Sequence, residues 1–383
     1  MTSQASSAGS ATGTPTRVHL IYPHGDHIST PDAIGRQLGQ RLEARYEVVY
    51  HDWSDRDVIP PDPGDILLGH PHPDPNTVFR RSIQLEGWRR RIMMAPFNHA
   101  DLRQVAFAGP LLLNCDLFLA ITGPYWFGTL ADSRCSHWRP KMIHLDLAID
   151  RNDYPPLKAS FGSPGKRQVV YVGHTYGYKN TPYLSQIAAR VPEVEFTWIG
   201  SGTREIRGLT ALGQVDFASL AGKALIAEFD FLLTVGKADA NPTTILEAMA
   251  WGLIPVCTPT SGYQGIPSIP NVPLGDAATA AAVVRGLVSA DESELLEMQT
   301  NNWRLLDERY TWDRFAAQVV AAIESTDSPS LLPASLGRRL EFAFCERTAP
   351  YGRAGRLVAK ADRRWRRLRS AAVARIAGSP RQK

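Results

Sequence analysis

The sequence predicts an α/β protein made of two domains of similar size, each built around a parallel sheet. Short apolar runs that suit buried strands alternate with segments of helical periodicity along most of the chain. A segment rich in Pro, Gly and Ser, residues 151–167, interrupts this alternation and has the composition of a linker. The 383 residues suffice for two or three domains, and 44% hydrophobic with 21% charged residues is a globular composition.

The first domain is expected to be Rossmann-like and to cover residues 17–150, after a small, polar, disordered leader over residues 1–16. The β-branched run at residues 17–22 is its first strand. Residues 30–45 follow with apolar side chains at helical spacing behind a Ser-Thr N-cap. Further short buried strands are expected at residues 46–53, 65–69, 91–95, 115–122 and 141–146. This alternation indicates βαβ units.

The second domain is expected to cover residues 168–325, where the same rhythm restarts after the linker. We expect its strands at residues 168–173, 194–200, 229–236 and 254–258. Helices are expected at residues 181–191, 243–251, 276–289 and 291–310. The last amphipathic segment, residues 310–325, is expected to close this domain.

The formal net charge of +4 hides a strong asymmetry. Residues 331–383 hold 14 Lys and Arg against 3 acidic residues, which leaves 28 basic and 35 acidic residues in the rest of the chain. The tail, residues 326–383, is expected to be largely helical, and residues 361–376 can be drawn as a basic amphipathic helix that contains Trp365. Such a helix suits an anionic membrane surface, and packing against the body is the alternative. No nucleic-acid motif accompanies the charge, so we expect no nucleic-acid partner.

Cysteine spacing and hydropathy predict the compartment. The four cysteines lie far apart and form no CxxC pair, which argues against a disulfide framework or a zinc knuckle and fits a reducing compartment. No apolar run approaches the roughly 20 residues of a membrane span. We therefore expect a cytoplasmic protein, with peripheral attachment to the inner face of the membrane if the tail binds lipid.

The most informative stretch runs from Asp239 to Gly252 and places two acidic residues eight positions apart. An Asn-Pro pair precedes a helix there, so Thr243 and Thr244 fall in the first turn, where free N–H groups and the helix dipole favour an anion such as a diphosphate. Glu247 follows one turn later, where a carboxylate can accept hydrogen bonds from a ribose diol. On spacing alone, an acid near a helix start is equally a favourable partner of the dipole.

This stretch resembles the E-x7-E motif of the retaining GT-B glycosyltransferases, a large group of sugar transferases. The matching positions are Asp239, Pro242, Glu247-Ala248-Met249-Ala250, Gly252 and Pro255-Val256. Asp239 departs from the family's first Glu, which keeps the charge and shortens its reach by one methylene.

A second block resembles the family's V-G-R-x-x-x-x-K-G element. Here Val172-Gly173 precedes His174, which stands at the Arg position, and Lys179 stands at the Lys position. Shorter blocks agree in order and spacing at residues 199–202, 229–236, 260–265 and 309–313, so the resemblance covers residues 168–325.

The resemblance implies a GT-B fold, with two Rossmann-like domains whose parallel sheets face each other across a cleft. It implies a metal-independent hexosyltransferase that moves a sugar from a nucleotide-diphosphate sugar, used as substrate and not as cofactor, to a glycan or lipid-linked acceptor with retention of configuration. The donor would contact Glu247, Lys179, His174, Gly173, Thr243 and Thr244, and also Gly25 in the loop after the first strand. The catalytic side chains would be Asp239 and a histidine of the first domain, for which His99 is the candidate.

Two further motifs carry metal-ligating or acidic side chains, and two other functions remain as alternatives. His70, His72 and Asp74 carry metal-ligating groups, but alternating prolines and the lack of a second cluster argue against a metal site. The Asp55-Arg-Asp57 motif reads as a solvated loop. A nucleotide-sugar epimerase of the same fold, or a non-catalytic relative that binds a glycan or partner protein, stays open as an alternative.

Overall fold

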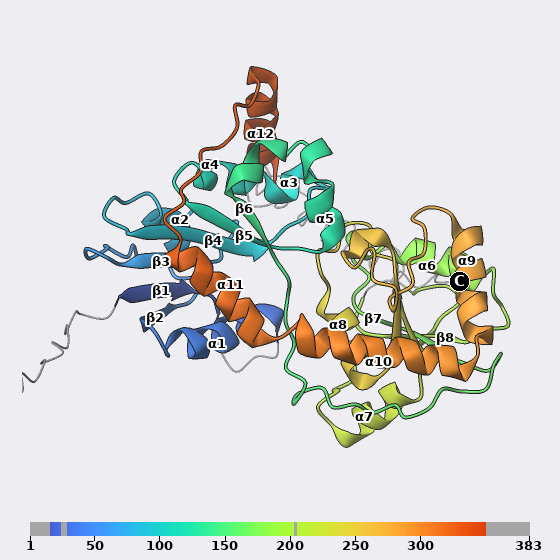
Figure 1. The fold of residues 1–383 in the computed structure, drawn as a ribbon. Helices are drawn as coiled ribbons and strands as arrows, with labels where there is room; N and C mark the ends of the chain where they lie inside the picture. Colours follow the sequence, from blue (N-terminus) through green and yellow to red (C-terminus); the bar gives the residue numbers. More distant parts are fainter. Residues whose placement is uncertain (1–15, 24–28, 203–204, 350–383) are drawn as a thin grey trace, which may run out of the picture.

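The computed structural model describes residues 16–23, 29–202 and 205–349 of the chain. These residues form two α/β domains that lie next to each other, each with one sheet and its own surrounding helices (Figure 1). Within these ranges no helix has the length and apolar character needed to cross a bilayer.

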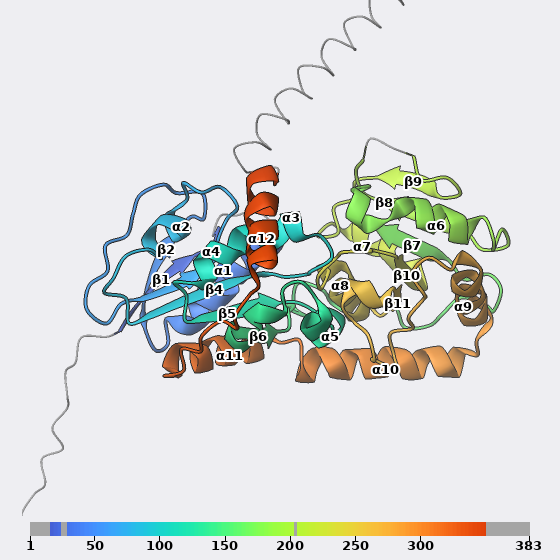
Figure 2. The same ribbon diagram turned by 90° about the horizontal axis from the view of Figure 1, so that it is seen from above.

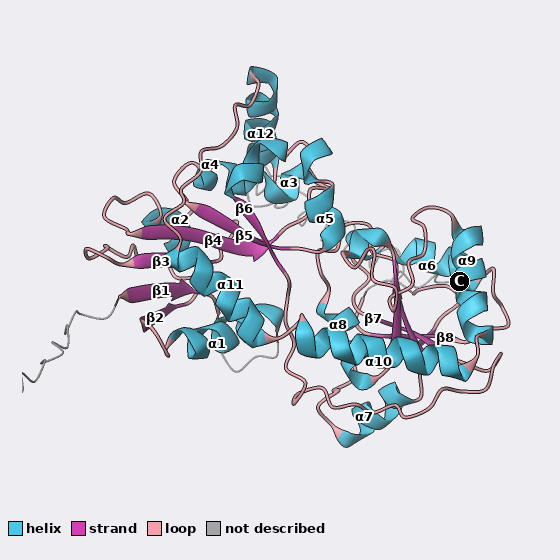
Figure 3. Ribbon diagram, viewed as in Figure 1, coloured by secondary structure: helices cyan, strands magenta, loops and turns pink. Residues whose placement is uncertain are grey.

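The N-terminal sheet has six parallel strands in the order β2-β1-β3-β4-β5-β6. The strands are β1 (Arg17–Ile21), β2 (Glu47–His51), β3 (Ile66–Gly69), β4 (Arg90–Pro96), β5 (Leu117–Ile121) and β6 (Met142–Leu145). Every residue of β3 and β5 is buried, as expected for central strands of a parallel sheet covered on both faces. The strand arrows point toward the second domain, so the carboxyl ends of the strands face it (Figure 3).

Short helices surround this sheet, and two of them, α1 and α3, have a side-chain N-cap. The longest, α1 (Thr30–Leu42), starts after Ser29, whose hydroxyl accepts a hydrogen bond from the backbone N–H of Asp32 at 3.4 Å. The others are α2 (Val78–Ser82), α3 (Leu102–Val105), α4 (Gly109–Leu112) and α5 (Pro124–Gly128).

The C-terminal sheet has five parallel strands in the order β11-β10-β7-β8-β9. The strands are β7 (Val169–Val172), β8 (Phe196–Ile199), β9 (Thr210–Gly213), β10 (Phe231–Thr234) and β11 (Ile254–Cys257). Its helices are α6 (Thr181–Ala188), α7 (Leu220–Ala227), α8 (Thr243–Trp251), α9 (Ala277–Ser289) and α10 (Glu292–Glu308). The sequence did not predict β9 or α7. The strand β9 was missed because it is an exposed edge strand with no apolar run.

The helix that we expected to close the C-terminal domain lies instead on the N-terminal domain. This helix, α11 (Trp312–Glu324), packs against α1 and β4, and α10 and α11 run one after the other along one side of both domains (Figure 2). Phe315 and Val319 enter the hydrophobic core that contains the N-terminal strands. Arg41 on α1 also pairs with Asp313 of this helix at 2.6 Å. The apolar stripe that predicted the helix is therefore buried against the N-terminal domain.

The described part of the tail adds one more helix, α12 (Leu336–Thr348), which packs against α3 of the N-terminal domain. A helix in the C-terminal region is therefore confirmed. The amphipathic helix expected at residues 361–376 lies outside the described residues.

The two domains meet at a close backbone contact. Gly123, which precedes α5, lies so near Gly262 that a Cβ added to Gly123 would stand 1.9 Å from the Gly262 carbonyl oxygen. Beside it the Trp126 Nε1–H donates to the carbonyl of Thr260 at 3.0 Å. This contact places the carboxyl ends of both sheets at one junction, which is where ligands of open α/β sheets bind.

Candidate active site

Two adjoining cavities occupy the junction between the domains. The first, the Asp239 cavity, has a volume of about 380 Å³, and the second, the Glu247 cavity, about 270 Å³. They adjoin because Thr30, Leu147 and Thr243 line both. Each is lined by residues of both domains, so together they form the candidate site at the junction.

An ion pair between Lys179 and Asp239 lies in the wall of the Asp239 cavity. Lys179 Nζ lies 2.5 Å from Asp239 Oδ2, and each side chain is 13% exposed. The two residues come from the loops that follow β7 and β10, and the backbone N–H of Lys237 donates to the Tyr178 carbonyl at 2.9 Å to join these loops. The structure therefore brings together the cation and the acid that the sequence placed 60 residues apart.

The N-terminus of α8 opens into the same cavity. Pro242 is its N-cap, and no side chain of the described residues caps the helix. Thr243 and Thr244 form the first turn and line the cavity. Asn241 precedes them in the left-handed conformation with φ of 54° and is only 3% exposed. A helix start with unfilled N–H groups beside Lys179 is suited to bind an anion.

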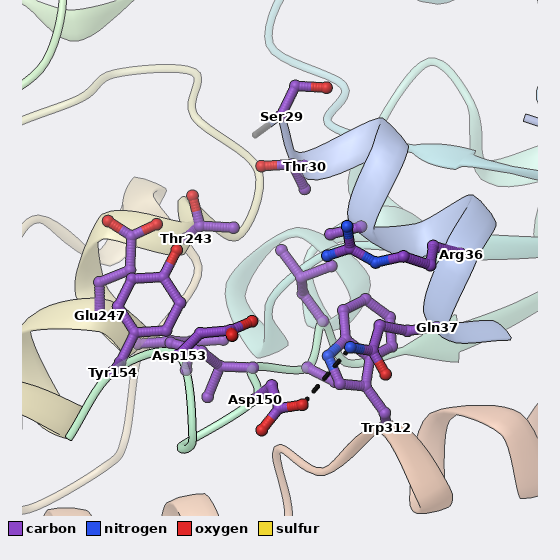
Figure 4. Close-up of a pocket in the computed structure, with 15 residues that line it drawn as sticks. Ser29, Thr30, Arg36, Gln37, Asp150, Asp153, Tyr154, Thr243, Glu247 and Trp312 are labelled. Atoms are coloured by element: carbon purple, nitrogen blue, oxygen red, sulfur yellow. Dashed lines mark hydrogen bonds between the residues drawn. The ribbon is translucent and has the colours of Figure 1, made fainter. Parts of the chain in front are cut away.

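Glu247 lies one turn further along α8 and faces the second cavity. Its carboxyl group is hydrogen-bonded to Thr243 and to Tyr154 of the linker. Burial raises the pKa of Glu247 to about 7, although both hydrogen bonds and the charge of Lys179 act in the opposite direction. Across the cavity stand Arg36 and Gln37 of α1 (Figure 4).

His174 and Gly173 lie away from these two cavities. His174 is exposed, and its Nδ1 lies 2.9 Å from the Ser201 hydroxyl. It lines a separate, larger cavity of about 1140 Å³ together with Tyr176 and Lys237. Gly173 accepts a hydrogen bond from Trp198 Nε1 at 2.9 Å, and its φ of 148° favours glycine.

His99 does not line either junction cavity. Its Nε2 lies 3.0 Å from the Thr129 hydroxyl, its ring stands edge-on to Trp126 at 5.0 Å, and burial lowers its pKa. The preceding residue, Asn98, lines the Asp239 cavity instead and donates to the Ala238 carbonyl of the other domain at 3.3 Å.

A different histidine, His70, faces the Asp239 cavity from the end of β3. Its ring packs against Tyr22 at 5.7 Å and Trp53 at 4.8 Å, and its buried Nδ1 has no hydrogen-bond partner among the described residues. Burial lowers the pKa of His70 to about 3, so the ring is neutral near neutral pH. In the sequence His70 is a candidate only as a metal ligand; its position directly after a buried strand is the signal that could have indicated a cavity residue.

Two further expectations concern Gly25 and metal ions. Gly25 lies in residues 24–28, outside the described residues. Among the residues that the structure does describe, no three His, Cys, Asp or Glu side chains are grouped so that they could hold a metal ion.

Comparison with solved structures gives the fold class. Sucrose-phosphate synthase from Thermosynechococcus elongatus superposes with a TM-score of 0.59 at 16% identity, over 80% of this chain and 98% of that chain. A trehalose-6-phosphate structure from E. coli, bound with UDP-2-fluoro glucose, reaches 0.61 at 11% identity over 82% and 100%. A glycosyltransferase from Rickettsia africae reaches 0.59 at 9% identity over 82% and 98%.

These similarities show a GT-B fold with two parallel-sheet α/β domains, and they confirm the predicted fold class. No sequence-family profile matches the chain. No curated protein matches it in sequence.

Proposed function

We propose that this protein is a retaining, metal-independent glycosyltransferase that moves a sugar from a nucleotide-diphosphate sugar to a glycan or lipid-linked acceptor. One observation carries the proposal: Lys179, Asp239, the open N-terminus of α8 and Glu247 line two adjoining cavities between the domains. A cation, a helix N-terminus and a buried acid are the groups that a diphosphate and a ribose require.

The donor would lie along the first turns of α8. Its diphosphate would take the place beside Lys179 and the N–H groups of Thr243 and Thr244, and its ribose diol would donate to Glu247. Asp239, 2.5 Å from the Lys179 ammonium, would exchange part of this ion pair for hydroxyl groups of the transferred sugar. The free protein thus keeps Lys179 in position until the diphosphate arrives.

In the reaction the bond between the anomeric carbon and the diphosphate oxygen breaks, and a bond from that carbon to an acceptor hydroxyl oxygen forms on the same face. The acceptor proton passes to the departing diphosphate. The main requirement is to stabilise the negative charge that develops on the diphosphate, and Lys179 with the α8 N-terminus supplies this stabilisation. EDTA is therefore expected to leave the rate unchanged.

The acceptor would enter from the N-terminal domain. His70, Asn98 and Gln104 line the Asp239 cavity from that side and offer hydrogen-bonding groups to a sugar hydroxyl. UDP-sugars are the donors to test first, since the E. coli structure of similar fold was solved with UDP-2-fluoro glucose.

A coupled assay of nucleoside diphosphate release tests the proposal. Purified protein is mixed with UDP-, GDP- or ADP-sugars, with and without a mixture of glycan and lipid-linked acceptors. We expect release only when an acceptor is present, and at least about a hundredfold less release by Lys179→Ala and Glu247→Gln. Lys166→Ala, which changes an exposed loop lysine, is the matched control and should match the wild type.

Two outcomes would contradict the proposal. Interconversion of the donor sugar without release of the diphosphate would identify an epimerase. Donor binding without turnover on any acceptor, together with wild-type behaviour of both site variants, would identify a binding protein.

A further inference from the structure

The helix α12 has two faces of different character. Its inner face packs on the N-terminal domain, where the Phe342 ring lies 5.2 Å from the rings of Trp138 and His137. Both acidic residues of the helix are paired with arginines of the N-terminal domain, Glu341 with Arg134 at 2.7 Å and Glu346 with Arg80 at 3.4 Å. Every acid on α12 is therefore neutralised by the domain on which the helix packs.

The outer face presents large apolar side chains and arginines to solvent. Leu336, Leu340 and Phe344 recur every four residues and are 64%, 62% and 67% exposed. Arg339 and Arg347, also exposed, fall on the same side of the helix. Single exposed apolar residues are ordinary, but a stripe of three flanked by cations marks an interaction surface.

We propose that this outer face of α12 binds an anionic lipid bilayer, with the three apolar side chains at the level of the headgroups and the arginines on lipid phosphates. The charge of the chain favours this partner. Residues 350–383, which follow α12 directly, hold 11 Lys and Arg and a single acid, Asp362. An apolar stripe with a dense positive charge is the pattern of an interfacial membrane helix.

Other partners suit this face less well. Nucleic acid would use the arginines but leaves no role for two leucines and a phenylalanine. A second copy of the chain would bring like charges together, since the outer face carries Arg339 and Arg347 and no acid.

The position of α12 connects this surface with the candidate active site. The helix packs against α3, and Gln104 of α3 lines the Asp239 cavity. A bilayer bound at α12 would thus lie one short helix away from the acceptor side of the cavity. This last step rests on the proposed function, and it selects a lipid-linked acceptor over a free glycan; the lipid-binding surface itself does not depend on it.

Vesicle flotation of the full-length protein tests the surface. The vesicles contain phosphatidylcholine alone, or with roughly one third phosphatidylglycerol to supply anionic charge. We expect flotation only with the anionic vesicles, and loss of flotation in high salt. Replacing Leu336, Leu340 and Phe344 by Ser should reduce the bound fraction at least about tenfold, and so should Arg339→Glu with Arg347→Glu.

Matched controls come from exposed positions outside α12. The triple change of Leu212, Leu220 and Leu274 to Ser removes three exposed apolar side chains of the C-terminal domain and should leave flotation unchanged. Arg304→Glu with Arg314→Glu makes the same charge change at exposed positions of α10 and α11 and should have a much smaller effect. Circular dichroism and the thermal midpoint establish that each variant is folded.

Three results would overturn the proposal. One is flotation of the Leu336/Leu340/Phe344 variant at the wild-type level. Another is self-association of the wild type that this variant abolishes, without any flotation. The third is binding of duplex DNA in place of anionic vesicles. Stabilisation by nucleoside diphosphates, measured on the same preparations, reports separately on the proposed function.

Discussion

At the residue scale, Lys179 is held in the cavity wall by Asp239 and is not left to solvent. The sequence predicted this pair as a donor-binding cation and a catalytic acid, because the spacing of both blocks matched a known family. It did not predict that they contact each other. The sequence also indicated His99 as the histidine of the first domain, whereas His70 lines the Asp239 cavity. The sequence could not show this, because the direction of a side chain in a loop after a strand depends on packing against residues elsewhere in the chain, here Trp53 for His70 and Trp126 for His99.

The raised pKa of Glu247 predicts a pH dependence of donor binding. A carboxylate accepts hydrogen bonds from both ribose hydroxyls, so binding favours the ionised form, whereas the free site is protonated below its pKa of about 7. Affinity for a nucleotide-diphosphate sugar should therefore rise with pH by up to about tenfold per unit below 7 and level off above it. Calorimetric titration at a series of pH values measures this affinity. The Glu247→Gln variant should bind the donor more weakly, and its affinity should not depend on pH in this range. If the variant shows the same pH profile as the wild type, Glu247 is not the source of the pH dependence.

The two histidines can be separated by paired substitutions. His70→Ala removes a hydrogen-bonding group from the Asp239 cavity and should lower kcat/KM for transfer roughly tenfold, while nucleoside diphosphate affinity stays unchanged. Because the pKa of His70 lies near 3, the loss should be equal across neutral pH. His99→Ala is the comparison variant and should keep kcat/KM within about twofold of wild type. A greater loss in His99→Ala than in His70→Ala would reverse this assignment.

At the scale of secondary structure elements, the start of α8 depends on an unusual backbone conformation. Asn241 adopts a left-handed φ of 54° immediately before Pro242, and this turns the chain from the Asp239 loop into the helix. The sequence predicted the helix from Pro242 and the apolar spacing. It could not predict β9, whose residues are all exposed, or the destination of α11, because an apolar stripe does not specify which domain covers it.

Substitution of Asn241 tests this turn. Asn241→Gly should change the free energy of unfolding little, because glycine adopts positive φ without strain. Asn241→Val should lower the free energy of unfolding by about 1–3 kcal/mol, because a β-branched residue is strained at positive φ. The same variant should also bind nucleotide more weakly. Urea denaturation gives both values. Equal stability of the two variants would show that the left-handed turn is not what positions α8.

At the scale of the whole molecule, the site exists only while the domains are together. The cavities take residues from α1 and β3 of one domain and from α8 and the Lys179 loop of the other. The sequence predicted two domains and a linker, and hence a junction, but it contained no signal for the contact between Gly123 and Gly262 that sets their separation.

A single methyl group at that contact should force the domains apart. Gly123→Ala places its Cβ against the Gly262 carbonyl, so we expect a lower thermal midpoint, by a few degrees, and weaker donor binding. Gly128→Ala lies at the end of α5, the helix that Gly123 precedes; a Cβ there would meet nothing within 4 Å, so this variant should behave as wild type. Small-angle scattering should show a larger radius of gyration for Gly123→Ala alone. The same radius and midpoint in both variants would mean that the two domains do not meet here in solution.

The most direct measurement for the central claim is the thermal midpoint of the protein with UDP, GDP and ADP and their sugar conjugates. A ligand that binds only the folded state raises the midpoint. At least one base should raise it by roughly 3 °C or more in the wild type and in Lys166→Ala, and by far less in Lys179→Ala. If no nucleoside diphosphate stabilises the wild type, or if Lys179→Ala is stabilised as much as the wild type, the junction between the domains is not a nucleotide-diphosphate sugar site.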